Sequence, residues 1–422
     1  MAVEDNTGTP KRARMAGLFL AVGLAFALSL SGSALKSIVQ VYFSDIAHGL
    51  SVGLGTFAWA TTLFAIGIAV ASPIVGYLAD RFGGAPVLVF GTILAALTFL
   101  ACAAAPSAFA FAPVYGMLGS IAYTMLSYVP LGKLADEVFA NRGEGLAYSV
   151  MTNGPAVGFM VLVPLWVWLG TFLSWRTVFA IAGAFMLVVL TPVALFLRAS
   201  LAEDTQNTED SETLATSISI AARLRPILSN GRYVALAVSF GGCGVTMAFI
   251  DVHMVNSMHM AGVGPSAISG AVFLLGLLEI VGALVAGRLC DSGYVRQTLV
   301  AGYGLRGCAM LLGAVAPTAV SSLAFGALFG ASYMATVVAT TLWVSRLLPA
   351  ESRATAMGLV WTVHSGGAAL SSQGGAVIAE RLHSYTLVSL VEALVAFASM
   401  AIVLAVWLRE RGAREQLVQP DR

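Results

Sequence analysis

The sequence predicts an all-α integral membrane protein with twelve transmembrane helices, arranged as two repeats of six. Of the 422 residues, 58% are hydrophobic and 10% are charged, whereas a soluble protein carries about 25% charged residues. Apolar runs of the length that crosses a bilayer, about 20 residues, recur along the chain. One long polar segment near the middle divides these runs into two groups of six.

Each apolar run is expected to be a helix, because a helix satisfies its own backbone hydrogen bonds inside the bilayer. Small residues recur within the runs, as in GIAVASPIVG at 67–76, and they allow helix backbones to approach closely. In chain order the predicted spans are 16–43, 55–79, 86–105, 108–132, 145–170, 176–197, 233–259, 266–288, 298–317, 319–345, 355–379 and 385–408.

The domain boundaries follow from the polar segment SLAEDTQNTEDSETLATS at 200–217, which is acidic and almost free of large apolar residues. Such a composition cannot form a packed core. We therefore expect an N-terminal six-helix bundle at 1–197 and a C-terminal six-helix bundle at 233–422. The cytoplasmic linker between them, at 198–232, is expected to contain a short interfacial helix at 218–229.

Lysine and arginine predict the orientation of the spans. They lie before the first span, after the last one and in every second short loop, at Lys11, Arg12, Arg14, Arg81, Lys133, Arg142, Arg288, Arg296, Arg346, Arg353, Arg409, Arg411 and Arg414. The opposite loops hold Arg176 and Arg381. Because basic residues concentrate on the cytoplasmic side, both termini are predicted to be cytoplasmic.

The composition also excludes several classes of function. The net charge of +1, without any dense mixture of basic and aromatic residues, argues against a nucleic-acid partner. The five histidines are scattered and no metal or nucleophile motif stands in a span, so we expect no metal, no cofactor and no intramembrane enzyme. The glycine-rich runs are not followed by a Walker lysine, which argues against ATP as the energy source.

A loop motif repeats between the two halves. GYLADRFGG at 76–84 ends the second span and GRLCDSGYV at 287–295 ends the eighth, and the same spacing separates Arg142 from Arg353. In the first copy a glycine lets the helix end pack closely, the aspartate can accept hydrogen bonds from the start of an adjacent helix, and the arginine holds the cytoplasmic side shut. The residues expected to act in gating are Gly76, Asp80, Arg81, Gly83 and Asp291. The alternative is an ordinary charged loop.

Two six-helix repeats, one long central loop and the motif G-x-L-a-D-r-x-G resemble the major facilitator superfamily along the whole chain. The resemblance implies a secondary transporter in a bacterial inner membrane that works as a monomer. It also implies a substrate site near the bilayer midplane, between the two halves, and makes the loop motif a conformational latch.

A closer resemblance concerns the monocarboxylate transporters. ALKSIVQVYFSDI at 34–46 is similar to their first helix, and YVPLGKLADEVFANRGEGLAYSVMTNGPAVG at 128–158 to their fourth and fifth. Glu279 stands where the family has an acid in the eighth helix, but Ala283 stands where it has an arginine that clamps the carboxylate. The family's aromatic-rich motif before the first helix is also missing. The resemblance therefore favours a neighbouring bacterial branch, similar to monocarboxylate transporters and oxalate–formate antiporters.

Ionisable side chains inside spans are costly and are therefore functional candidates by default. Lys36 is roughly 30 Å from the cytoplasmic end of the first span at 1.5 Å per residue. It is predicted to draw an anionic substrate into the outward-open cavity. The alternative is that its ammonium group reaches the outer membrane surface with no role in transport.

Two further cationic side chains are predicted substrate ligands. Arg306, in the ninth span, either replaces the missing arginine or forms a structural pair with an acid such as Glu392. His364, in the eleventh, either reads the charge of the substrate together with the proton or packs between helices. Asn153 and Tyr123 add hydrogen-bonding capacity on the fourth and fifth helices.

Glu279, Asp251 and His253 are the predicted proton-coupling residues, because acids and histidines whose ionisation changes with access suit a proton-coupled carrier. For Asp251 and His253, the alternative is a cap at the outer membrane surface. Proton-coupled uptake of a small organic anion is the main functional hypothesis. Efflux of a drug or metabolite by proton antiport stays open, since Gly154, Pro155 and Gly158 match part of an efflux motif. Uptake of a larger solute such as a vitamin also stays open.

Overall fold

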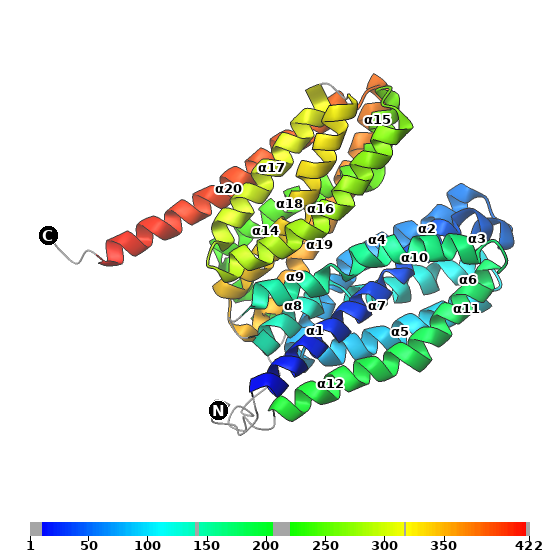
Figure 1. Ribbon diagram of the computed structural model, residues 1–422, viewed down its shortest axis with the longest axis horizontal. Helices are drawn as coiled ribbons and strands as arrows, with labels where there is room; N and C mark the ends of the chain where they lie inside the picture. The colour runs from blue at the N-terminus through cyan, green and yellow to red at the C-terminus, as the bar shows by residue number, and fades with distance from the viewer. Residues whose placement is uncertain (1–10, 140–142, 206–219, 316–317, 419–422) are drawn as a thin grey trace. The chain divides into compact units, whose positions relative to one another are not determined.

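The computed structural model describes residues 11–139, 143–205, 220–315 and 318–418, and these residues are almost entirely helical (Figure 1). No β-strand occurs in this part of the chain. The predicted all-α class is therefore confirmed. Arg142, which was assigned to a cytoplasmic loop and to the repeat, lies outside the described residues.

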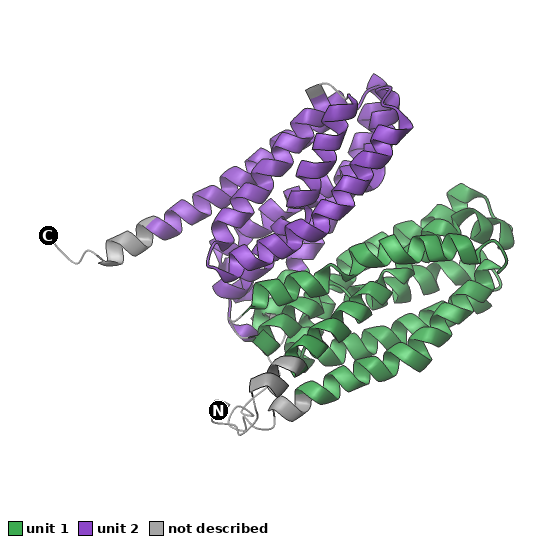
Figure 2. Cartoon of the chain, viewed as in Figure 1, with its two compact units in different colours: residues 1–220, 351–358 green, residues 221–350, 359–422 purple. Residues whose placement is uncertain are grey.

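The chain forms two compact units (Figure 2). Unit 1 comprises Met1–Ile220 and Glu351–Gly358, and unit 2 comprises Ala221–Ala350 and Leu359–Arg422. The helix α19 (Arg353–Leu382) therefore begins in unit 1 and continues in unit 2.

Unit 1 contains six long helical stretches, several of them built from consecutive segments. The first stretch is interrupted at Ser33, where the backbone N–H donates to Leu30 O at 3.2 Å, and the fifth is interrupted at Asn153. The segments are α1 (Lys11–Gly32), α2 (Ala34–Val41), α3 (Phe43–Gly49), α4 (Leu54–Phe82), α5 (Gly84–Ala104), α6 (Ala108–Pro113), η1 (Val114–Gly119), α7 (Ser120–Met125), α8 (Tyr128–Phe139), α9 (Glu144–Thr152), α10 (Gly154–Leu169), α11 (Trp175–Phe185), η2 (Met186–Leu190) and α12 (Thr191–Thr205).

Unit 2 holds the remaining helices. They are α13 (Ile220–Ser229), α14 (Gly231–Ala248), η4 (Phe249–His253), α15 (Met254–Met260), α16 (Pro265–Asp291), α17 (Val295–Val315), α18 (Ala319–Leu347), η5 (Ala350–Ser352), most of α19, and α20 (Thr386–Val418). The segment η4 is π-helical, and such bulges often occur at functional sites. The expected linker includes the end of α12 and all of α13, while its residues 206–219 lie outside the described part.

Ten helical stretches in the described residues are long and apolar enough to cross a membrane. They coincide with ten of the twelve predicted spans. The other two, at 298–317 and 355–379, form α17 and α19, which are helical but are not among these ten. Both carry polar groups in their middle turns, with Arg306 in α17 and His364 in α19. Ten apolar spans are thus found, and the count of twelve stays a prediction.

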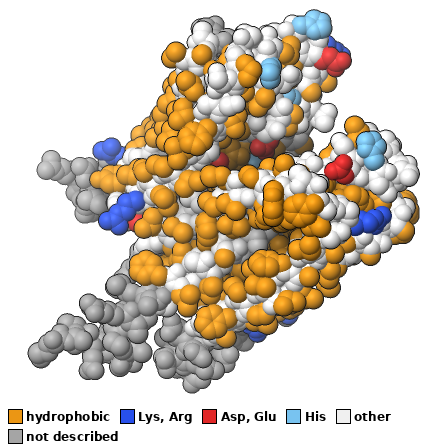
Figure 3. Space-filling view, turned by 45° about the vertical axis from the view of Figure 1, so that its right-hand side comes forward, with side chains coloured by type: hydrophobic (Ala, Val, Ile, Leu, Met, Phe, Trp, Pro, Cys, Tyr) orange, Lys and Arg blue, Asp and Glu red, His pale blue; other side chains and the backbone are white. Residues whose placement is uncertain are grey.

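The helices expose large apolar side chains, among them Phe19, Trp59 and Phe109 in unit 1 and Phe273 and Leu394 in unit 2. Figure 3 shows hydrophobic side chains over most of the visible described surface. A soluble monomer rarely exposes a continuous apolar patch larger than a few hundred Å². A lipid environment accounts for such a surface.

Close helix packing in unit 2 depends on glycine. Gly326 and Gly330 on α18 face α16, where an added Cβ would collide with the carbonyl oxygen of Ala271 or Leu275. Small residues allow this approach, and close backbone packing is a main source of helix association in lipid. The framework that holds the buried polar residues of unit 2 is therefore tightly packed.

Candidate functional site

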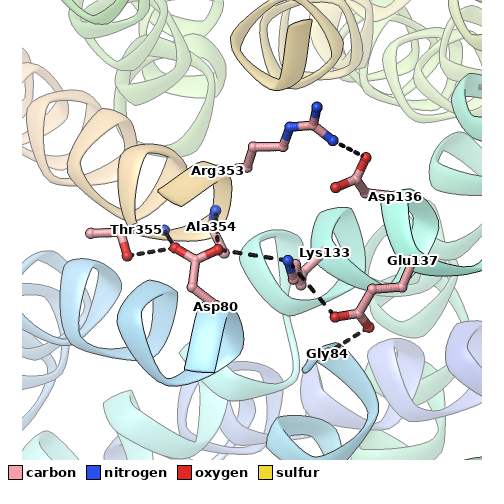
Figure 4. A network of polar contacts seen from close by, with 8 residues as sticks. All are labelled: Asp80, Gly84, Lys133, Asp136, Glu137, Arg353, Ala354 and Thr355. Carbon is pink, nitrogen blue, oxygen red and sulfur yellow. Dashed lines mark hydrogen bonds and ion pairs between the residues drawn. The ribbon is translucent and has the colours of Figure 1, made fainter. Parts of the chain in front are cut away.

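The loop motif in unit 1 forms a polar network at the start of α19 (Figure 4). Asp80 lies at the end of α4, and its side chain is completely buried. Its carboxylate accepts hydrogen bonds from the backbone N–H of Ala354 (3.0 Å) and Thr355 (2.7 Å) and from the Thr355 hydroxyl (2.6 Å). Negative charge is favoured at a helix N-terminus, where backbone N–H groups lack partners. Asp80 thus caps the first turn of α19.

Lys133 on α8 connects this cap to a second carboxylate. Its ammonium nitrogen lies 3.9 Å from Asp80 Oδ1 and 3.9 Å from Glu137 Oε1. Glu137 in turn accepts a hydrogen bond from the backbone N–H of Gly84, the first residue of α5, at 3.1 Å. The network therefore joins the ends of α4, α5, α8 and α19.

An ion pair between Arg353 and Asp136 adds a second link between α8 and the start of α19. Glycine permits the close approach at this place, because a Cβ on Gly76 would collide with the backbone of Ala354. Gly83 has φ +90°, a conformation that L side chains rarely adopt, and it lets the chain turn from α4 into α5.

The other predicted gating residues are placed differently. Arg81 is exposed and lies over the ring of Phe82, 5.2 Å from its centroid. Asp291, in the second copy of the motif, is partly exposed at the end of α16. Nearby, Arg346 donates to the carbonyl oxygen of Cys290 at 3.4 Å. Among these residues, Asp80 is the one that holds α19, and the gating roles stay predictions.

Sequence reasoning missed Lys133, Asp136 and Glu137 as parts of this network, and treated Arg353 as a topology signal. One local sign was available: Lys133 and Glu137 are four residues apart on one helix, a spacing that brings opposite charges together. Their contacts with Asp80 and Gly84 join segments far apart in the chain, and no local pattern reveals them.

Arg306 is the centre of a polar cluster in unit 2. Its side chain is completely buried and its guanidinium lies 5.0 Å from the ring centroid of Phe329. It donates hydrogen bonds to Cys243 Sγ (2.9 Å), Thr246 Oγ1 (3.3 Å), Ser332 O (3.1 Å), Tyr333 O (3.0 Å) and Thr336 Oγ1 (3.1 Å). All of these acceptors are neutral, so the hydrogen bonds leave the positive charge uncompensated.

The structure brings two other predicted residues, Glu279 and His364, within electrostatic range of Arg306. Glu279 on α16 experiences the charges of Arg306 and Asp251, and His364 on α19 experiences that of Arg306. The imidazole of His364 packs against Trp361 and Phe240, with ring centroids 4.7 and 5.0 Å apart, and its Nε2 lies 3.2 Å from Met247 Sδ. Asp251 itself is exposed on η4.

Among the described residues, no hydrogen bond or ion pair joins Arg306 to Glu392, the structural pair considered as an alternative. Glu392 on α20 instead accepts a hydrogen bond from Ser371 Oγ at 2.6 Å. His253 is buried, and its Nε2 lies 3.1 Å from the carbonyl oxygen of Ser372. Ser371 and Ser372 of α19 are polar contacts that sequence reasoning did not single out, although the stretch SGGAALSSQGG contains them.

Three predicted substrate ligands lie in unit 1. Lys36 is partly exposed on α2, while its neighbour Ser37 is buried and accepts a hydrogen bond from Trp166 Nε1 at 3.0 Å. Asn153 is buried at the break between α9 and α10. Tyr123 on α7 is partly exposed, and its ring packs against Phe64 at 5.7 Å. Their roles in binding stay predictions.

No three side chains of His, Cys, Asp or Glu are grouped as metal ligands in the part of the chain that the structure describes. The geometry contains a guanidinium, carboxyl groups and imidazoles inside helices that are otherwise apolar.

Known proteins match the chain over most of its length. Residues 18–372 match the family described as Major Facilitator Superfamily. The uncharacterized MFS-type transporter YcxA of Bacillus subtilis (strain 168) is 25% identical over 400 residues, covering 92% of this chain and 95% of that protein. Monocarboxylate transporter 13 of Rattus norvegicus is 23% identical over 351 residues, covering 82% of this chain and 78% of that protein.

A solved structure shows the same fold. The MFS proton:xylose symporter XylE, bound to 6-bromo-6-deoxy-D-glucose, superposes with a TM-score of 0.71 at 12% identity, covering 93% of this chain and 96% of that chain.

Proposed function

We propose that this chain, which belongs to the Major Facilitator Superfamily, takes up a small organic anion together with protons. The family and the relatives make the chain a multi-pass membrane transporter and not an enzyme.

The observation that carries the proposal is the charge arrangement around Arg306. Its hydrogen bonds go to neutral acceptors, and Glu279 acts on it through space. When Glu279 is ionised, its negative charge offsets the charge of Arg306. When Glu279 binds a proton, this offset is lost and an anion is attracted instead. An anion at ~4 Å from a cation, with an effective dielectric near 20, gains about 4 kcal/mol before desolvation, so proton binding to Glu279 would favour anion binding.

Two comparisons support this assignment. Several relatives are named monocarboxylate transporters, and a transporter with the same fold is named a proton:xylose symporter. Lys36 in unit 1 supplies a further cation for an anionic substrate. Transport would then proceed by alternating access, with Asp80 holding the start of α19 in one state of the cycle.

The test uses purified protein in proteoliposomes, with labelled lactate, pyruvate and oxalate as probes. An inward proton gradient should drive accumulation of one of them, and a protonophore should collapse it. Glu279→Gln should abolish proton-driven accumulation, because an amide cannot bind and release the proton. Glu380→Gln, which changes an exposed acid on α19, is the matched control and should leave accumulation unchanged.

Two outcomes would reject the proposal. Full transport driven by sodium, or without any ion gradient, would reject proton coupling. Transport of an antibiotic or a vitamin, with no transport of the three carboxylates, would reject the organic anion and favour efflux or uptake of a larger solute.

The topology is part of the same proposal. Twelve spans, cytoplasmic termini, a bacterial inner membrane and a working monomer agree with the loop charges and the family. A periplasmic reporter enzyme fused within the 198–232 linker should be inactive, and an active fusion would overturn this orientation.

A further inference from the structure

Glu392 is a buried acid for which neither the loop motif nor the Arg306 cluster gives a role. Only 2% of its surface is exposed, and its Oε1 accepts the hydroxyl hydrogen of Ser371 at 2.6 Å. Its Oε2 has no hydrogen-bond partner among the described residues. An ionised carboxylate in apolar surroundings is costly unless it is paired. With one accepted hydrogen bond and no cationic partner among the described residues, these surroundings favour the neutral acid over the ionised carboxylate.

A buried histidine lies one helical turn away. Gly375 follows Ser371 by one turn of α19, and Val388 precedes Glu392 by one turn of α20. A Cβ on Gly375 would meet His253 Nε2 at 2.7 Å and the Val388 side chain at 3.3 Å, so the imidazole lies at the level of these two residues. Four residues correspond to roughly 6 Å along a helix, which brings His253 and Glu392 into the same small region.

His253 also contacts the wall of a cavity in unit 2. The cavity has a volume of about 90 Å³, and Phe249, Tyr385, Ser257 and Ser322 are among its lining residues. The ring of His253 lies 5.3 Å from that of Tyr385 and 6.1 Å from that of Phe249. A polar cavity larger than about 15 Å³ can hold water. The cavity is large enough to hold water, and the two aromatic rings that contact His253 line it.

We propose that Glu392 and Ser371 form a proton-binding site inside unit 2, with His253 as the titratable side chain between this site and the cavity. The bound species is the proton itself, held on the carboxyl group of Glu392 while Ser371 donates to the other oxygen. A carbonyl oxygen accepts at His253 Nε2, so Nε2 carries hydrogen and Nδ1 is the atom that accepts a proton. The site is distinct from Glu279, whose charged neighbours are Arg306 and Asp251.

The surroundings of Glu392 contain few groups that would hold a negative charge. α20 packs against α14, α17 and α19. The titratable side chains in the middle turns of these helices and of η4 are Cys243, Asp251, His253, Tyr303, Arg306, Cys308 and His364. The cation among them, Arg306, directs its hydrogen bonds to neutral acceptors on α14 and α18. Ser371 is therefore the group that contacts the carboxyl of Glu392.

Infrared spectroscopy of the purified protein tests the site directly, because a protonated carboxyl group has a carbonyl stretch that an ionised one lacks. Wild-type protein should show such a band at neutral pH that disappears in Glu392→Gln. Ser371→Ala should keep the band but shift its frequency, since one hydrogen bond is lost. Glu410→Gln is the matched control on the same helix: Glu410 is ion-paired with Arg296 at 2.6 Å, so this change should remove no band.

If Glu392→Gln does not fold, Ser371→Ala still decides the question, because it keeps the acid and predicts the frequency shift. A band that stays at the same frequency in both variants would overturn the proposal. So would a wild-type protein that shows a protonated-carboxyl band lost only in Glu279→Gln.

The role of this site in transport rests on the proton coupling proposed above, and transport measurements separate the two. In proteoliposomes, Glu392→Gln should weaken the pH dependence of the apparent substrate constant, and Glu392→Asp should restore part of it. A lost infrared band without any proton-driven uptake in wild type would reject the proposed function but support the site. The site alone would be rejected if wild type shows proton-driven uptake while Glu392→Gln keeps both the pH dependence of the apparent substrate constant and the infrared carboxyl band.

Discussion

Asp80→Asn tests whether the polar network holds the first turn of α19. The aspartate accepts hydrogen bonds from two backbone N–H groups and one hydroxyl of Ala354 and Thr355. Asparagine keeps a single side-chain acceptor and loses the charge that Lys133 compensates. A hydrogen bond to a charged group contributes about 1.5–3 kcal/mol, and a charge at a helix N-terminus up to ~2 kcal/mol. We therefore expect a loss of roughly 2–4 kcal/mol in the free energy that holds this turn.

Hydrogen exchange measures this loss at the affected amides. Since 1.4 kcal/mol corresponds to a factor of ten, the amides of residues 354–358 should exchange about 30 to 700 times faster. Amides in the middle of α5 should be unaffected, and transport should be reduced while the protein stays folded and inserted. Arg81→Gln is the control for the exchange measurement alone: Arg81 is exposed beside Phe82, so its loss should leave exchange at residues 354–358 unchanged. Unchanged exchange at 354–358 together with unchanged transport kinetics would refute the role of Asp80.

Three further changes test the remaining predictions. Lys36→Met should raise the apparent substrate constant for an anion about five-fold, because roughly 1 kcal/mol of attraction is lost. Lys36→Arg should keep part of the affinity. Equal substrate constants for wild type and Lys36→Met in uptake assays would mean that the Lys36 ammonium only extends to the membrane surface and does not attract substrate. Gly76→Ala should lower the thermal unfolding temperature, because the added Cβ would collide with the backbone of Ala354. Gly55→Ala is the control and should leave the temperature unchanged, since a Cβ there has no atom within 4 Å. Equal unfolding temperatures for the two variants would contradict the close approach at Gly76. Arg306→Lys should destabilise the protein by about 3 kcal/mol or more, because a compact ammonium cannot reproduce the planar set of donors. Cys243→Ala removes a single acceptor and should have a smaller effect on thermal unfolding.

The fold could be predicted largely from apolar length. The expected spans 55–79 and 266–288 correspond to α4 (Leu54–Phe82) and α16 (Pro265–Asp291), since a run of apolar residues has few alternatives in a bilayer. The interruptions could not be predicted in the same way. The break at Ser33 and the π-helical turn of η4 depend on how neighbouring helices pack, which no local pattern records.

The candidate site could be predicted where a single sequence motif contains the functional residue. It could not be predicted where the role of a residue depends on its contacts with residues of other helices. Asp80 was identified because the residues of its loop motif have a recognisable spacing. The motif predicts that the aspartate accepts hydrogen bonds from the start of an adjacent helix, and the backbone N–H groups at the start of α19 donate to it. Glu392 was considered as a partner of Arg306 because both are ionisable residues inside spans. Their actual neighbours, Ser371 for one and neutral oxygen and sulfur atoms for the other, depend on which face each helix turns inward.

The two units carry different chemistry, and α19 belongs to both. Its first residues, Arg353, Ala354 and Thr355, contact Asp80 or Asp136 in unit 1, while His364 and Ser371 belong to unit 2. A helix transmits displacement along its axis because its backbone hydrogen bonds are continuous. If the proposed proton site at Glu392 acts in transport, its partner Ser371 belongs to the same helix whose first turn Asp80 caps.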